Sequence, residues 1–116
     1  MQFMCMLKND ERSAPAPQEV YAAMAEFEQE GRRNGTLVEL GGLLPSAAGA
    51  IVSLADGRIS HVDGPFAESK ELVGGYAIIE VRSRDEAVEL GRRLMAIHLE
   101  HAPGWEGSCE IRQIAG

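Results

Sequence analysis

Apolar positions along the chain fall into six short strand-like runs, at residues 2–7, 36–40, 50–54, 58–62, 76–81 and 108–114. The run 2–7 is apolar at both parities, and so is the run 76–81 apart from Glu80. Strands with this pattern are typically covered on both faces. Asp56–Gly57 separates the third and fourth runs, which predicts a tight hairpin turn between them.

Two longer segments carry the helical period. The first begins near Pro17, a residue suited to a first helical position, and ends at Asn34–Gly35. The second begins with Ser83 and Glu86, which are spaced as a capping box. The buried stripe predicted for the first helix is Val20, Met24, Phe27 and Gly31, and that for the second is Ala87, Leu90, Gly91, Leu94 and either Ile97 or His98.

The resulting order β-α-β-hairpin-β-α-β predicts a single α+β domain over residues 1–116, with a ferredoxin-like plan and an added hairpin. Helices can cover only one face of such a sheet. The other face would then present Met or Ile side chains from at least two strands, and soluble proteins avoid exposing such a surface. We therefore predict a homodimer with the two sheets facing each other.

Net charge and the length of the apolar runs limit the kinds of molecule that the protein is expected to bind. The net charge is −7 and the pI is about 4.9, which argues against nucleic acid because phosphate binding needs a basic surface. No apolar run approaches the ~18 residues of a membrane span, so no membrane association is predicted. The N-terminal segment lacks the basic region of a secretory signal, and the expected location is cytoplasmic.

The segment DGPFAESK, Asp63–Lys70, holds three charges between two strand-like runs and is the best candidate for a site. His61 stands two residues before Asp63, so in a strand both side chains point to one face. Such a pair could act as catalytic acid and base. The structural alternatives are an aspartate that starts a turn and a solvent-facing hairpin histidine.

The candidates for substrate binding are Phe66, Glu68 and Lys70 within this segment, with Gly42 and Trp105 outside it. Four of them, all except Phe66, have a structural alternative as well. Glu68 and Lys70 could form an exposed pair that contributes little energy. The glycine could serve a tight turn, and the tryptophan could cap the core.

No metal and no cofactor is predicted. His98 and His101 have i, i+3 spacing, but no third ligand stands out apart from His61. The sequence contains no phosphate loop, no dinucleotide fingerprint and no G-x-S-x-G elbow. Two cysteines, Cys5 and Cys109, do not make a disulfide framework, and the first is interpreted as a small core residue.

Three stretches together resemble the YCII-related proteins, and more narrowly their DGPF-domain subgroup: DGPFAESKELVGGYAIIEV, GGLLPS at 41–46 and APGWEGSCEIRQI at 102–114. The resemblance implies a dimeric α+β barrel built on a ferredoxin-like protomer. Some relatives carry a His–Asp dyad thought to be catalytic, with its histidine near the first helix or second strand. No histidine precedes His61 here, so His61 with Asp63 substitutes for that dyad and does not match it.

Two functional hypotheses follow. The first is a small-molecule enzyme or binder with its site between the sheet and the DGPF segment, acting by proton transfer or elimination on a small organic molecule. The second is a non-catalytic dimer that docks a protein partner such as a transcription regulator. Subgroup members are encoded beside extracytoplasmic-function sigma factors, and a basic partner would suit the charge of −7.

Overall fold

A computed structural model of the chain describes residues 1–66 and 71–116. Over these residues the elements are β1 (Gln2–Asn9), α1 (Gln18–Arg33), β2 (Leu37–Gly42), the 3₁₀ turn η1 (Ser46–Ala48), β3 (Ala50–Ala55), β4 (Arg58–Asp63), β5 (Leu72–Glu80), α2 (Arg84–His101) and β6 (Gly107–Gln113). The predicted order of strands and helices is confirmed, and the class is α+β.

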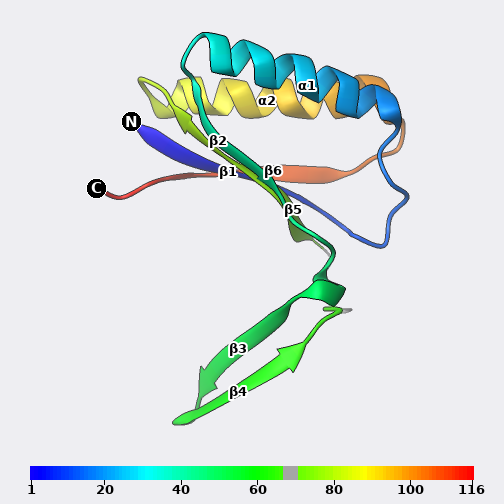
Figure 1. The fold of residues 1–116 in the computed structure, drawn as a ribbon, viewed down its shortest axis with the longest axis vertical. Helices are drawn as coiled ribbons and strands as arrows, with labels where there is room; N and C mark the ends of the chain where they lie inside the picture. Colours follow the sequence, from blue (N-terminus) through cyan, green and yellow to red (C-terminus); the bar gives the residue numbers. More distant parts are fainter. Residues whose placement is uncertain (67–70) are drawn as a thin grey trace.

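The main sheet has the order β2-β5-β1-β6, and each neighbouring pair is antiparallel. This arrangement is compatible with a ferredoxin-like fold. Figure 1 shows α1 and α2 side by side over one face of the sheet, while β3 and β4 project away from it as a separate two-stranded sheet. The helices therefore leave the second face of the main sheet uncovered.

The core lies between the helices and the sheet. Phe3 on β1 is directly opposite Ile79 on β5, and both are buried against Ala87 of α2. Val20 of α1 is fully buried as well. Glycine at position 91 lets α2 approach β6 closely, because an added Cβ atom would lie 2.9 Å from Ile111 Cδ1. Small and apolar side chains thus hold the helix layer on the sheet.

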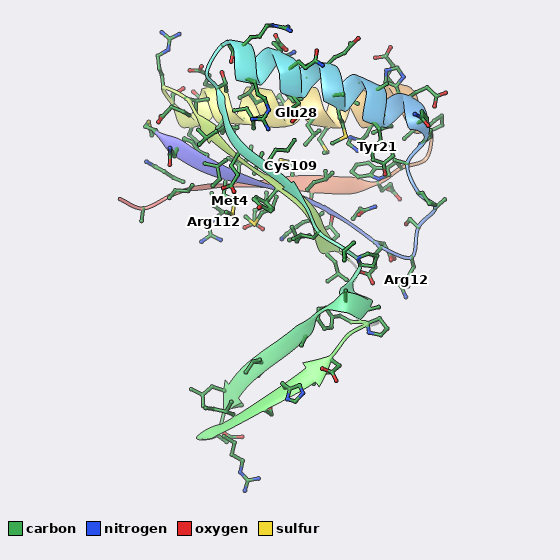
Figure 2. All side chains as sticks on the ribbon, in the orientation of Figure 1. Met4, Arg12, Tyr21, Glu28, Cys109 and Arg112 are labelled. Carbon is green, nitrogen blue, oxygen red and sulfur yellow. The ribbon has the colours of Figure 1, made fainter. Side chains whose placement is uncertain are left out.

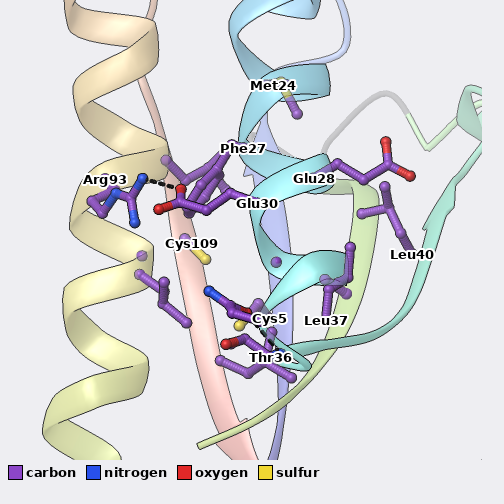
Figure 3. A pocket seen from close by; sticks show the side chains of 17 residues that line it. Cys5, Met24, Phe27, Glu28, Glu30, Thr36, Leu37, Leu40, Arg93 and Cys109 are labelled. Carbon is purple, nitrogen blue, oxygen red and sulfur yellow. Dashed lines mark hydrogen bonds and ion pairs between the residues drawn. The ribbon is translucent and has the colours of Figure 1, made fainter.

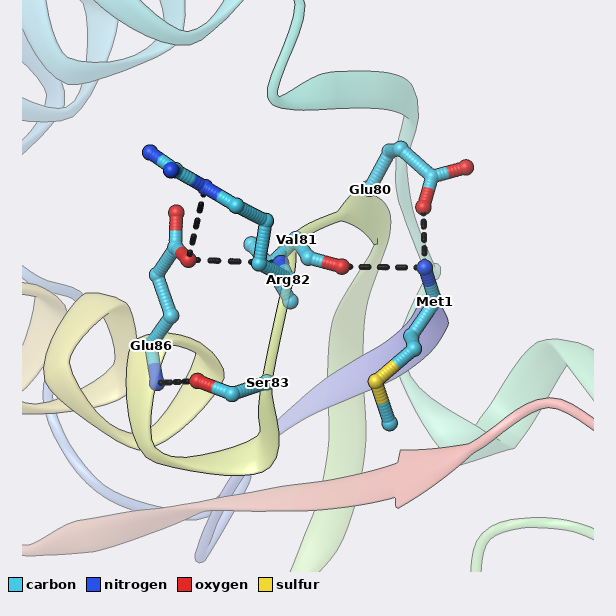
Figure 4. A network of polar contacts seen from close by, with 6 residues as sticks. All are labelled: Met1, Glu80, Val81, Arg82, Ser83 and Glu86. Atoms are coloured by element: carbon cyan, nitrogen blue, oxygen red, sulfur yellow. Dashed lines mark hydrogen bonds and ion pairs between the residues drawn. The ribbon is translucent and has the colours of Figure 1, made fainter.

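The start of α2 is capped largely as its sequence indicates (Figure 4). The Ser83 hydroxyl accepts a hydrogen bond from the Glu86 backbone N–H at 3.1 Å, which confirms the predicted N-cap. The reciprocal bond reaches one residue further back, since the backbone N–H of Arg82 donates to the Glu86 carboxylate at 3.2 Å. At the same end of the sheet the Met1 ammonium pairs with Glu80.

The uncovered face of the main sheet has an apolar centre. Met4 lies opposite Ile78, and Met6 lies opposite Tyr76, so these four side chains share one face. Figure 2 shows Met4 and Arg112 on the side of the sheet away from the helices. All four apolar side chains are half-buried, although no element of the described chain covers them. We call Met4, Met6, Tyr76 and Ile78 the apolar face.

A strip of charges borders the apolar face along β6. Lys8 donates to Glu110 at 2.6 Å, and Arg112 lies 3.2 Å from the same carboxylate. Both interactions lower the pKa of Glu110, the lysine having the larger effect. The strip gives this side of the sheet the apolar centre and polar rim that are typical of protein interfaces. Neither helix in the described residues combines the length and apolarity that a membrane crossing needs.

The projecting hairpin carries apolar side chains with little cover. On one of its faces Leu54 lies opposite Ile59, and Val52 lies opposite His61. The exposed fractions of Val52, Leu54 and Ile59 are 71%, 74% and 78%. Because directly opposed residues share a face, Asp63 opposite Ala50 belongs to the same side. We call this side the His61 face of the hairpin.

Candidate functional site

One buried serine anchors the base of the hairpin. The Ser46 backbone N–H and hydroxyl both donate to the Glu11 carboxylate, at 2.9 and 2.7 Å. The hydroxyl oxygen in turn accepts a hydrogen bond from the Phe66 backbone N–H at 2.8 Å. These three bonds, here called the Ser46 anchor, join the β1–α1 loop, η1 and the DGPF segment. A hydrogen-bonded carboxylate is a strong partner for a buried hydroxyl.

Gly64 lies next to the Ser46 anchor, and the backbone of Ser46 packs directly on it. Its N–H donates to the Gly49 carbonyl at 2.8 Å. A Cβ atom built at position 64 would lie 1.6 Å from the Ser46 carbonyl oxygen, a distance that no side chain can adopt. The glycine and the phenylalanine of the DGPF motif therefore have structural roles here: close backbone approach and attachment to Ser46.

His61 and Asp63 lie together on β4. The distance from His61 Nε2 to Asp63 Oδ1 is 3.7 Å, and the two side chains are 65% and 82% exposed. The strand period thus places them on one face, as the sequence indicates, and their catalytic role stays a prediction. Figure 1 places β4 far from the helix layer, so this pair is separate from the protein core.

A second histidine has the same geometry and provides a natural comparison. His101 Nε2 lies 3.7 Å from Glu100 Oε2 at the end of α2. A distance of this size between a histidine and a carboxylate is therefore not distinctive by itself. The feature that separates His61 from His101 is its setting among the exposed apolar side chains of the hairpin.

The predicted substrate-binding residues do not all share one place. Gly42 ends β2 opposite Gly75, with no heavy atom within 4 Å of a Cβ built there. Phe66 is held by the Ser46 anchor through its backbone. Glu68 and Lys70 lie outside the described residues. Their predicted roles stay predictions.

Trp105 lies on the loop between α2 and β6, where it stacks on His98 with ring centroids 4.1 Å apart and planes at 32°. The imidazole is 3% exposed, and its Nδ1–H donates to the Leu94 carbonyl at 2.9 Å. This packing closes one end of the helix layer, which favours the structural alternative for the tryptophan. Within residues 1–66 and 71–116, no three side chains of metal-ligand type come together.

A cavity that sequence reasoning did not predict lies between the helices and the sheet (Figure 3). It measures about 120 Å³ and is largely apolar. Met24 and Phe27 line it from α1, and Leu90 and Leu94 line it from α2. We call it the helix–sheet cavity. Apolar cavities of this size can hold a small organic group, since one of about 150 Å³ accepts benzene.

The two cysteines lie side by side at the floor of the helix–sheet cavity. Both thiols are free and half-buried. Their interaction with each other is the main cause of their opposite shifts in pKa: it raises the pKa of Cys5, with help from burial, and lowers the pKa of Cys109. The pair therefore loses its first proton from Cys109.

An ion pair between the helices forms part of the cavity rim. The Arg93 guanidinium donates to the Glu30 carboxylate, and its central carbon lies 4.6 Å from the centroid of the Phe27 ring (Figure 3). The hydrogen bond from Arg93 lowers the pKa of Glu30. Cation–π contact and ion pair together tie α2 to α1 at this point.

Comparison with known protein families matches residues 1–102 to the YCII-related domain. The chain belongs to the YCII-related family. It is also 36% identical, over 81 residues, to an uncharacterized protein of Rhizobium meliloti (strain 1021). That match covers 70% of this chain and 61% of the relative, so the chain spans less than two thirds of the relative's length. The family is thereby established, and the chemistry has to be argued from the site.

The sequence of this YCII-related domain gives little indication of the helix–sheet cavity or of the Ser46 anchor. Gly91 of α2 and Ala77 of β5 line the cavity, and neither has a long side chain that would fill it. Glycine in a helical stripe also indicates close packing, so it does not distinguish a cavity from a tight contact. The Ser46 anchor has no local pattern, because Glu11 and Ser46 are 35 residues apart in the chain.

Replacing Glu30 with glutamine should lower the free energy of unfolding of this YCII-related domain only at pH values where Glu30 of the wild type is ionised. Its folded-state pKa lies below the ordinary value of 4.5, so its stabilising effect is complete above pH 4.5 and disappears as pH falls through the lower, folded-state value. Urea unfolding should show the variant slightly less stable than wild type at pH 7 and equal to it at strongly acidic pH. Glu26→Gln on the same helix is the control, and an unchanged difference across this pH range would contradict the assignment.

Proposed function

We propose that this YCII-related protein is a homodimer that binds a small organic molecule and transfers a proton on it, with His61 and Asp63 as the acid–base pair beside the DGPF segment. The observation that carries the proposal is the placement of this pair, 3.7 Å apart, on an apolar hairpin face with its base held by the Ser46 anchor. A reacting pair of this kind needs defined geometry and exclusion of water.

Dimerisation is supported by the apolar face of the main sheet. Its four side chains form a continuous centre on β1 and β5, bordered by the charges of Lys8, Glu110 and Arg112. The described chain has no element with which to cover them. In our proposal a second copy of the protein covers the apolar face, and the two sheets pack face to face in a dimeric α+β barrel.

The hairpin is proposed to complete the site across the dimer. Its His61 face exposes Val52, Leu54 and Ile59, which favours burial against another protein surface. In a two-fold dimer the same contact is made twice, so each copy would cover the His61 face of the other. That cover would remove water from the His–Asp pair and form a pocket that a single protomer lacks in its described residues.

The proposed chemistry needs only the two side chains. A neutral His61 imidazole would take a proton from the bound molecule, and the Asp63 carboxylate would orient the ring and stabilise the imidazolium that forms. Return of the proton at a second atom of the molecule would complete an isomerisation, and loss of a leaving group would complete an elimination. Gly42, with open space at its α-carbon, is kept as a candidate contact for the substrate.

We also place the chain in the DGPF-domain subgroup and in the cytoplasm. Asp63 to Phe66 spell the subgroup motif; the phenylalanine of that motif takes part in the Ser46 anchor, and the glycine lies next to it. The two neighbouring cysteines are unpaired, as is usual in a reducing compartment.

A fragment screen by ligand-observed NMR tests the site. We expect fragments that bind wild type to lose at least ~10-fold in affinity to His61→Gln and Asp63→Asn, because each change removes a hydrogen bond to a charged or reacting group. His101→Gln is the matched control, since its histidine has the same 3.7 Å contact with a carboxylate. Fragments that bind the His61 and Asp63 variants as tightly as wild type would exclude the proposed site.

Docking of a basic transcription regulator is a second candidate, favoured by the exposed apolar hairpin and the net charge of −7. Under this alternative, substitution of His61 or Asp63 would leave function unchanged, whereas Val52→Glu would abolish binding of the regulator. The two candidates are therefore separated by variants on the same hairpin face.

A further inference from the structure

Cys5 and Cys109 are diagonal neighbours on adjacent strands. In the β1–β6 register Cys5 lies opposite Ile111, and Leu7 lies opposite Cys109. Cys5 and Ile111 both pack against the core on the helix side of the sheet, and Cys109 shares their face because it is two residues before Ile111. Both sulfur atoms therefore face the helix–sheet cavity, as Figure 3 shows.

We propose that the two thiols form a binding site for a trivalent organoarsenical, with the organic substituent of the arsenic in the helix–sheet cavity. An arsenoxide R–As=O condenses with two thiols: two As–S bonds form, the As=O bond breaks, and the oxygen leaves as water with both thiol protons. Arsenic stays trivalent throughout, so the step needs no oxidant or reductant. The lowered pKa of Cys109 supplies the first thiolate.

The diagonal placement favours a bridging atom over a direct disulfide. Diagonal neighbours in an antiparallel pair have Cα atoms about 7–8 Å apart. Disulfides usually join Cα atoms about 4.4–6.8 Å apart, and wider pairs need backbone movement. An arsenic atom between the two sulfur atoms lengthens the link by one atom, which suits the wider spacing.

The apolar surroundings favour a neutral adduct. A dithiolate that held a soft metal ion such as Cu⁺ would keep a net negative charge, and burying a charge without a partner is unfavourable. The arsenical adduct R–As(S–Cys)₂ carries no charge. Its substituent would meet Phe27, Leu90 and Leu94 in a space of about 120 Å³, somewhat smaller than the cavity of about 150 Å³ that accepts benzene. Gly91 leaves the approach to Cys109 Sγ free of a side chain, since an added Cβ would lie 3.9 Å from it.

Phenylarsine oxide is the probe for this site. One equivalent added to the reduced, folded protein should raise the intact mass by that of one phenylarsine oxide less one water, because a phenylarsenic group replaces the two thiol hydrogens. Excess 2-mercaptoethanol should leave the adduct in place, whereas 2,3-dimercaptopropanol should remove it. Cys5→Ser and Cys109→Ser should each make the arsenical adduct at least ~100-fold less stable against excess 2-mercaptoethanol. In wild type the second As–S bond forms within one molecule and therefore at a high effective concentration.

Alanine variants at the same two positions repeat the test in case a serine hydroxyl disturbs the apolar floor, and near-ultraviolet circular dichroism checks that each variant is folded. Three results would overturn the proposal. In the first, the adduct of a single-cysteine variant survives 2-mercaptoethanol as well as the wild-type adduct does. In the second, 2-mercaptoethanol removes the wild-type adduct, and in the third the adduct forms only in urea. Ready formation of an intramolecular disulfide with diamide would contradict the spacing argument. The proposal is independent of His61 and Asp63, which lie on the hairpin and outside the cavity.

Discussion

Gly64→Ala should detach the hairpin from its anchor and lower the free energy of unfolding by about 3 kcal/mol, at the upper end of the usual cost of overpacking. The new Cβ atom would meet the Ser46 carbonyl oxygen at 1.6 Å. That oxygen cannot move aside easily, because the Ser46 N–H and hydroxyl are both bound to Glu11 and the hydroxyl also holds Phe66. Relief therefore requires a shift of the backbone at the base of the hairpin.

Urea denaturation measures the loss of stability, and hydrogen exchange of residues 50–63 shows whether the hairpin is the part released. Gly42→Ala is the matched control: a Cβ atom there meets nothing within 4 Å, and the position is not among those with positive φ. We expect that control to stay within about 0.5 kcal/mol of wild type. If Gly64→Ala were equally harmless, the packing described for the DGPF segment would be wrong.

Met4→Glu should dissociate the proposed homodimer while leaving the protomer folded. Met4 lies on the uncovered face of the sheet, where a single protomer leaves it half-buried and a carboxylate can still reach water. In the dimer the new charge would be buried once in each copy, and Arg112, which lies opposite it on β6, is already paired with Glu110. Each burial costs several kcal/mol, and every 1.4 kcal/mol is about tenfold in affinity, so the dissociation constant should rise at least ~1,000-fold.

Sedimentation equilibrium measures this change directly, with wild type expected at twice the chain mass of 12.5 kDa. Leu99→Glu is the control, because this leucine on α2 is 84% exposed and lies in the helix layer, away from the apolar face. It should leave the dissociation constant within about threefold of wild type. A Met4→Glu protein that remained as dimeric as wild type would place the interface elsewhere.

Periodicity predicted those parts of the fold that depend on neighbours along the chain. The two-parity pattern of residues 2–7 and 76–81 gave the central strands β1 and β5, and Asp56–Gly57 gave the turn of the hairpin. The Ser83 cap was recognisable because its partner is three residues away. The strand period also placed His61 and Asp63 on one face.

Contacts between distant segments account for what the sequence did not reveal. Phe66 is hydrogen-bonded to Ser46, which lies 20 residues earlier in the chain, and no local sequence pattern predicts that bond. The neighbouring position of Cys5 and Cys109 depends on the β1–β6 register, which follows from the whole sheet. Trp105 was ambiguous for the same reason: only the folded chain brings its ring onto His98.

An isotope-filtered NOE spectrum can show whether the hairpin of each copy packs against the other copy of the homodimer. The sample is an equal mixture of labelled and unlabelled protein, allowed to exchange subunits. We expect cross-peaks from the labelled methyl groups of Val52 and Leu54 to protons of the unlabelled copy. A dimer without any such cross-peaks from the hairpin, or a protein that sediments at 12.5 kDa, would contradict the account.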